Sequence, residues 1–180
     1  MSGPMKKQRP PSLIDGWLGP EARLLERHQS RVAAPPERAY EAIGQVRLTE
    51  MLIVRALFTL RRIPYSKEMT LREFFGTPPF LILEEEAPQE MVIGTPAGFK
   101  DYASTPEEFR ASERRGTTQA IANFRVDATE TGSLISTETW IETFGRRARW
   151  LFRIYWLIVE PFSALIRREF LRTARKMAEG

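Results

Sequence analysis

Residues 150–168, WLFRIYWLIVEPFSALIRR, are the most apolar part of this 180-residue chain and decide its fold class. The stretch carries Arg153, Glu160 and Pro161 among its apolar residues. It has three interpretations: a membrane span, an ordinary core helix, or a helix that covers a cavity for an apolar ligand. The spacing of its residues, together with the rest of the chain, distinguishes among them.

From residue 145 onward, apolar residues recur in steps of three and four, which is typical of one face of an α-helix. The stripe comprises Ala148, Leu151, Phe152, Tyr155, Ile158, Val159, Phe162, Leu165, Ile166, Phe170, Ala174 and Met177. Arg153, Glu160 and Arg167 are seven residues apart and are predicted to lie on the other side. The pattern therefore predicts a long amphipathic helix.

The position of the proline also predicts which part of this helix is more deeply buried. Pro161 removes a backbone donor, so we expect the helix to kink or break there. The part before the proline should cover a cavity and the part after it should pack on a sheet. Phe162, Leu165 and Phe170 are then the expected buried anchors.

The stretch is too short and too charged for a membrane span. Residues 150–166 number 17, at the lower end of the range for spanning helices. Arg153 and Glu160 would each cost about 2.5–3.5 kcal/mol at the centre of a bilayer. A one-sided stripe suits a helix that covers a sheet, so the sequence predicts no membrane span.

The rest of the chain predicts strands for this helix to cover. We expect a first strand over residues 24–33, then a short helix that begins within APPE at residues 34–37, because proline suits the first helical position. A second helical segment, LTEMLIVRALFTLRR, should stop at Pro64. TLREFFG is expected in a loop and TPEEF in a short helical turn. Four strands are predicted in PPFLILEEEAP, QEMVIGTPAG, TQAIANFRVDAT and SLISTETWIETF.

This order predicts an α+β fold, in which a curved antiparallel sheet wraps around the long C-terminal helix, with two short helices after the first strand. Residues 1–20 are rich in proline, glycine and lysine and are expected to be a flexible segment. Residues 21–180 are expected to form one domain. A strongly bent sheet cannot close everywhere on a thick helix, so we expect a cavity between them.

Charge and composition narrow the classes of partner. The net charge is 27 − 23 = +4, and residues 146–176 hold nine Arg and Lys against two acids. Such an end suits nucleic acid, anionic lipid or plain solvation of a helix face. We expect mainly a solvated face that permits peripheral contact with an anionic membrane, and no nucleic acid.

The chain has no cysteine, so disulfides and thiolate metal sites are excluded. Its one histidine, His28, is expected on the surface or an edge, and we expect neither a metal nor a cofactor. The basic N-terminal residues precede no apolar segment, so a cytoplasmic location is expected.

Four segments together resemble the START-like, or SRPBCC, superfamily with its helix-grip fold, over about residues 25–179. They are HQSRVAAPPERAYEAI from residue 28, EEEAPQEMVIGTPAGF from residue 84, ANFRVDATETGSLISTET from residue 122 and YWLIVEPFSALIRREFLRTARKMAE from residue 155. Within that superfamily the chain is most similar to bacterial proteins described as polyketide cyclase/dehydrase and lipid-transport proteins. Such proteins tend to show N-F-x-V on one strand, T-E-T-R on the next and Y-W-x-x-I-x-P-x-S-x-x-I-R-R on the helix. The first pattern is present here, and Trp140 replaces the arginine of the second. The helix pattern is the most specific part of the match, with Val159 at its first isoleucine.

The resemblance implies a cavity under the long helix, but not one activity, because the fold hosts cyclases, hydrolases, lipid carriers and hormone receptors. We expect the chain to bind a small hydrophobic ligand such as a lipid, an isoprenoid or a polyketide. Whether it is an enzyme stays open. The alternatives are a cyclase or dehydratase that uses Glu138, and a module that docks a partner or a membrane surface.

Asn123 and Glu138 are the candidate polar groups of the site. The turn at residues 130–132 places them opposite each other in an antiparallel hairpin. If their face points at the C-terminal helix, they lie inside an apolar space, where burial would raise the pKa of Glu138 and make it a candidate catalytic acid or base. The alternative is a structural hydrogen bond or a pair that faces outward.

Aromatic residues are the candidate apolar lining. Phe152 and Tyr155 are expected to bound the cavity from the helix, and Trp140 is expected to contact the ligand from the sheet. Trp156 lies nearer to the charged side of the predicted helix and is a weaker candidate. An aromatic stripe at helical spacing is also typical of an ordinary core.

Overall fold

The structure, a computed structural model, describes residues 11–60, 66–97, 103–112 and 117–180. Its helices, with η for 3-10, are η1 (Leu13–Trp17), α1 (Pro36–Gln45), η2 (Leu48–Glu50), α2 (Leu52–Leu60), α3 (Leu71–Phe75), α4 (Pro106–Ala111) and α5 (Arg146–Glu179). Its strands are β1 (Arg23–Val32), β2 (Leu81–Glu86), β3 (Glu90–Ala97), β4 (Thr118–Thr129) and β5 (Gly132–Thr143). The five predicted strands and the long terminal helix are confirmed. The predicted stop at Pro64 and the first ten residues lie outside the described part of the chain.

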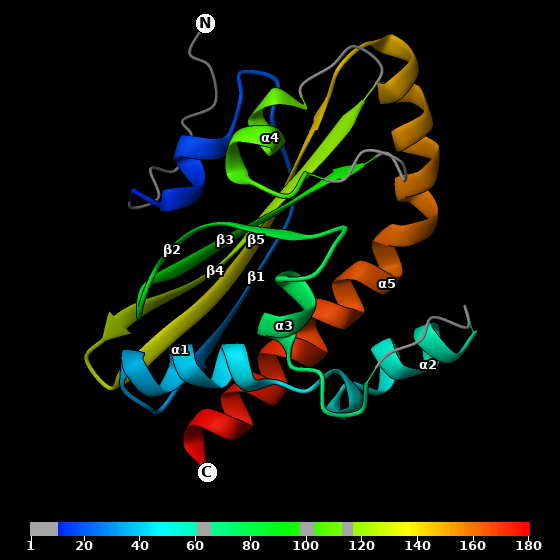
Figure 1. Cartoon of the computed structure of the whole chain (residues 1–180). Coiled ribbons are helices and arrows are strands. Elements are labelled where there is room, and N and C mark those ends of the chain that lie inside the picture. The colour runs from blue at the N-terminus through cyan, green and yellow to red at the C-terminus, as the bar shows by residue number, and fades with distance from the viewer. Residues whose placement is uncertain (1–10, 61–65, 98–102, 113–116) are drawn as a thin grey trace, which may run out of the picture.

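The five strands form one antiparallel sheet in the order β1-β5-β4-β3-β2. We call the face that α5 crosses the inner face; α1 and α3 lie beside α5 on this side (Figure 1). The register is irregular between Leu24 and Glu26 and between Ile82 and Glu84, near the two edges of the sheet. The fold is therefore α+β, with a curved antiparallel sheet around a C-terminal helix, which is the helix-grip arrangement.

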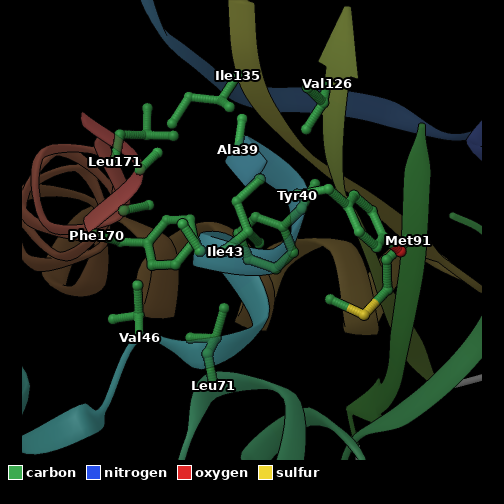
Figure 2. Close-up of a cluster of buried hydrophobic side chains, with 14 of the residues drawn as sticks. Ala39, Tyr40, Ile43, Val46, Leu71, Met91, Val126, Ile135, Phe170 and Leu171 are labelled. Atoms are coloured by element: carbon green, nitrogen blue, oxygen red, sulfur yellow. The ribbon is translucent and has the colours of Figure 1, made fainter. Parts of the chain in front are cut away.

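The inner core lies where the second half of α5 and α1 meet the sheet (Figure 2). Phe170 is only 2% exposed, and its ring centroid lies 4.8 Å from that of Phe124 on β4. The predicted burial of Phe170 is confirmed. Ile43 from α1, Val46 directly after α1 and Leu171 from α5 complete the contact (Figure 2).

The predicted burial of Phe162 and Leu165 is wrong, since these side chains are 47% and 46% exposed. Arg167 points at the sheet, where it contacts Glu26 and Thr137. A helix advances 100° per residue, so Phe162 and Leu165 lie about 140° and 160° around the axis from Arg167. The apolar stripe is wider than the surface that the sheet covers, and the sequence placed Arg167 on the wrong side.

The helix α5 is continuous from Arg146 to Glu179 with Pro161 inside it. A break at this proline, one of the two expected outcomes, is therefore wrong.

The expected loop around residues 70–76 is wrong, because Leu71–Phe75 forms the helix α3. A capping box begins this helix: the Thr70 hydroxyl accepts from the backbone N–H of Glu73, and the Glu73 carboxylate accepts from the N–H of Thr70. Phe74 and Phe75 then pack against the inner core.

A three-residue hydrogen-bond group joins α1, α3 and β2. Tyr40 donates to Glu85 over 2.5 Å, and Arg72 donates to both oxygens of Glu85 over 2.7 and 2.5 Å. Burial, and then the hydrogen bond to Glu85, raise the pKa of Tyr40. Burial works to raise the pKa of Glu85, but the hydrogen bonds from Arg72 and Tyr40 outweigh it, so that this pKa lies below its ordinary value.

The segment before β1 covers the other, outer face of the sheet. Ile14 of η1 is fully buried there, in a cluster with Val92, Phe109 and Ile121. Ser12 and the backbone N–H of Leu13 donate to the carboxylate of Glu90 over 2.5 and 3.0 Å. Residues 12–17 are thus packed against the sheet, whereas the sequence predicted a loose surface segment.

Candidate functional site

Asn123 and Glu138 are paired across the β4–β5 hairpin, as the turn predicted, and are 2% and 4% exposed. They lie on the outer face of the sheet. Phe124 contacts Phe170 of α5, and successive strand residues point to opposite faces, so Asn123 and its partner point away from α5. The hypothesis that this pair faces the C-terminal helix is therefore wrong.

The outer pair belongs to a network that attaches η1 to the sheet. The Asn123 side chain donates to Glu90 over 2.7 Å and accepts from the backbone N–H of Glu138 over 2.8 Å. The Glu138 carboxylate accepts from the Trp140 indole over 2.9 Å and pairs with Arg27 at 3.3 Å. These contacts favour the structural interpretation of both residues, and Trp140 belongs to this outer face as well.

The inner face holds a different polar group, which we call the Glu26 cluster: Glu26, His28, Thr137, Ser163 and Arg167. Glu26 on β1 pairs with Arg167 on α5 at 3.2 Å between Oε1 and Nε. Ser163 donates to the same carboxylate, and Arg167 also donates to the Thr137 hydroxyl. The second oxygen of Glu26 lies 3.0 Å from Nε2 of His28.

Burial dominates the electrostatics of the Glu26 cluster. The Arg167 guanidinium has lost most of its water, which lowers its pKa, while the charge and hydrogen bond of Glu26 act in the opposite direction. His28 lies on the edge strand β1, which confirms the edge position among its two predicted placements, but its side chain is only 16% exposed. A buried arginine and carboxylate persist because each satisfies the other.

Sequence reasoning missed this cluster for a definite reason. Arg167 was assigned to the polar side of the helix, although Ser163 and Arg167 stand four residues apart and so share a side. Glu26 and His28 are two residues apart on one strand and therefore share a face. These two spacings were the available signal.

Beside the cluster, the inner face carries small side chains. Towards the start of α5 it presents Thr95 of β3, Thr118 and Ala120 of β4, and Thr139 and Thr143 of β5, with the larger Ile141 between the last two. Thr139 is 8% exposed, and its hydroxyl has no hydrogen-bond partner within the described residues. A buried hydroxyl without a partner is costly, which makes Thr139 a candidate to bind a polar atom of a ligand.

Two aromatic rings of α5 face this small-residue surface. Trp156 lies eleven residues before Arg167, about three helical turns, and is on the same side of the helix. Its ring stacks on that of Phe152, with centroids 5.9 Å apart, and both residues are half-buried. Tyr155 is 55% exposed and 6.1 Å from Phe152, so it lies at the edge of this surface. The structure thus brings Trp156 to the sheet-facing side in place of Tyr155.

No protein-family model matches the sequence, and no curated protein matches it. Among solved structures, protein MLL2253 from Mesorhizobium loti is 12% identical with a TM-score of 0.41, covering 86% of this chain and 96% of that one. Protein CV1439 from Chromobacterium violaceum is 15% identical with a TM-score of 0.34, over 89% and 99% of the two chains. CalU16 from Micromonospora echinospora is 16% identical with a TM-score of 0.31, over 85% and 81%. These values are too low to support any functional argument.

Two further properties of the described residues bear on the site. None of their helices is long and apolar enough to cross a bilayer. They contain no group of three or more His, Cys, Asp or Glu side chains placed to hold a metal ion.

Proposed function

We propose that the protein binds a small hydrophobic ligand between the inner face of the sheet and the first half of α5. The observation that carries this proposal is the buried hydroxyl of Thr139, which lacks a partner among the described residues and sits on a surface of small side chains. A ligand oxygen would satisfy this hydroxyl. The apolar body of the ligand would lie against Phe152 and Trp156.

The chemistry of this surface suits a mostly apolar molecule with one polar end. Small residues opposite two aromatic rings favour an extended or ring-shaped hydrocarbon, and few polar groups are needed to orient it. Thr139 pairs with Ala122 in the sheet and with Glu26 across the β1–β5 edge, so a bound oxygen would lie next to the Glu26 cluster. Lipids, isoprenoids and polyketides, the classes implied by the START-like resemblance, meet this description.

The proposed site uses only part of the predicted set of residues. Phe152 lines it and Tyr155 lies at its edge, while Asn123, Glu138 and Trp140 are on the opposite face of the sheet and do not take part. Catalysis by Glu138 receives no support from this arrangement, since Glu138 has no access to the proposed ligand.

Native mass spectrometry of the purified protein, followed by titration with the fluorescent fatty acid cis-parinaric acid, tests the proposal. Thr139→Val removes the hydroxyl at nearly constant volume and should weaken binding about 2- to 10-fold, the value of one neutral hydrogen bond. Ala120→Phe should fill the space and abolish binding. Thr129→Val, at an exposed position at the end of β4, is the matched control.

Equal affinity of the wild type and the Thr139→Val and Ala120→Phe variants would overturn the proposal, provided that their circular dichroism is native. Absence of any bound or titratable apolar molecule in the wild type would do so as well.

A further inference from the structure

The first half of α5 exposes large apolar side chains on one flank, about 80–140° around the helix axis from the sheet-facing Arg167. Trp150, Ile154 and Leu157 are 62%, 42% and 73% exposed. They stand at positions i, i+4 and i+7, so they form one surface, which we call the apolar triplet. Isolated exposed apolar residues are ordinary, but three neighbouring ones indicate an interaction surface.

The same side of α5 becomes basic in its second half. Arg168, Arg172 and Arg175, the arginine triplet, follow the apolar triplet by 18 residues each. Eighteen residues make five full turns, so the two triplets share one side of the helix, about 27 Å apart along its axis. All three arginines are exposed.

The arginine triplet lines a groove of about 290 Å³ between α5 and residues 28–30 of β1. Arg175 is bonded to Glu179 at 3.0 and 3.1 Å, so its charge is partly neutralised. Arg168 and Arg172 have no carboxylate partner among the residues that the structure describes. Two unpaired guanidinium groups in one groove are suited to bidentate binding of phosphate.

Between Trp150 and Arg175, acidic residues do not interrupt this side of the helix. Glu160 is rotated by about 80° from Trp150, toward the sheet. The carboxylate of Glu169 is occupied, because it accepts from the backbone N–H groups of Leu52 and Ile53 over 2.7 and 3.0 Å. Arg146 and Arg147 add two exposed cations at the start of α5.

We propose that this side of α5 docks on an anionic phospholipid surface, with the apolar triplet in the headgroup boundary and the arginine triplet on lipid phosphates. Peripheral membrane binding gains from burial of exposed apolar and aromatic residues in the headgroup boundary and from attraction of arginines to anionic lipids, and this side of α5 supplies both along its length. A second copy of the chain is a poorer occupant. In an antiparallel pair its apolar triplet would cover the arginines, and in a parallel pair arginine would meet arginine, so either leaves the charges without partners. The proposal does not depend on the ligand site.

Co-sedimentation of the full chain with large vesicles tests this docking. We expect binding to vesicles of 70% phosphatidylcholine and 30% phosphatidylglycerol, and little binding to phosphatidylcholine alone. Raising the salt from 50 to 500 mM should weaken it, because screening is stronger. Leu157→Glu should lower the partition coefficient about tenfold or more. Arg168→Glu with Arg172→Glu should lower it at least about 30-fold, since each arginine near an anionic surface contributes roughly a fivefold effect and the new carboxylates are repelled as well.

Matched control variants distinguish a loss of docking from the effects of a changed net charge and of impaired folding. Leu24→Glu changes a leucine that is 46% exposed on β1, and Arg31→Glu with Arg38→Glu makes the same charge change on β1 and α1. These variants should retain most of the binding, apart from a weak loss due to net charge. Wild-type binding that is equal on the two kinds of vesicle, or that is unaffected by Leu157→Glu, would overturn the proposal.

Two further measurements test whether a second copy of the chain or free phosphate, in place of a membrane, binds to this side of α5. A wild-type dimer in multi-angle light scattering that Leu157→Glu converts to a monomer, without vesicle binding, would mean that this side is an interface between copies. A rise in thermal midpoint with inorganic phosphate at constant ionic strength, lost in the double arginine variant and again without vesicle binding, would mean that the groove takes free phosphate. Either result would overturn the proposal.

Discussion

The ion pair between Glu26 and Arg167 permits the sharpest stability prediction. Both side chains are largely buried, with 9% and 16% exposure, so removing one partner leaves a charge that water cannot reach. Such a loss typically costs about 3–5 kcal/mol of unfolding free energy. Because the two residues keep different remaining partners, the two single substitutions should not cost the same.

Glu26→Leu should be the more costly change. It leaves Arg167 with only the Thr137 hydroxyl, and it also removes the acceptor of Ser163 and the partner of His28. We expect a loss near the upper part of the range of about 3–5 kcal/mol. Arg167→Leu leaves the carboxylate with both of its other contacts, so we expect about 1–3 kcal/mol. The double variant should cost less than the sum of the two by about 1 kcal/mol or more.

Urea unfolding followed by circular dichroism, with the midpoint and slope fitted for each variant, measures these values. Arg175→Leu on the same helix breaks an exposed pair with Glu179, at 52% and 28% exposure, and should cost less than about 1 kcal/mol. A loss below about 1 kcal/mol for Glu26→Leu, or strictly additive single effects, would refute the argument that this pair is buried and coupled.

Three further perturbations test the packing and the charges. Phe170→Ala should lower the unfolding free energy by about 3–5 kcal/mol, and Leu165→Ala by less than about 1 kcal/mol, in the same urea assay; equal losses would contradict the proposed orientation of α5. Because the folded-state pKa of Glu85 lies below its unfolded value of about 4.3, its stabilisation is complete above that pH and lost as the pH falls through the folded pKa. Glu85→Gln should therefore lower stability at pH 7 and flatten its decline in acid, and an unchanged decline would count against this ion pair. Gly132 has φ +149, and an added Cβ would lie 2.2 Å from the carbonyl oxygen of Val32, so Gly132→Ala should cost more than about 1 kcal/mol; an unchanged urea midpoint would exclude this strain.

The local sequence pattern alone was sufficient to predict most of the helices and strands and the pairing of residues within the β4–β5 hairpin. Alternating and short apolar runs predicted the strands, and the turn at residues 130–132 predicted that Asn123 stands opposite Glu138. A hairpin turn sets the register of its strands directly, so no tertiary information is needed for that pairing. The capping box of α3 is also visible in the sequence, where Thr70 stands three residues before Glu73, so a local signal for this helix exists as well.

The tertiary structure decided which side of each element faces which neighbour. Both faces of the sheet are buried, one under α5 and α1 and the other under η1 and α4, so alternation along β4 could not show that Phe124 points to α5 and Asn123 away from it. The helix α5 has apolar residues around most of its circumference, and the charged Arg167 lies on the covered side because Glu26, far away in the chain, supplies its partner. The periodicity of apolar residues shows that the two sides of a helix or strand differ in polarity. Which of them is buried depends on contacts between residues distant in sequence, and these form only in the folded chain.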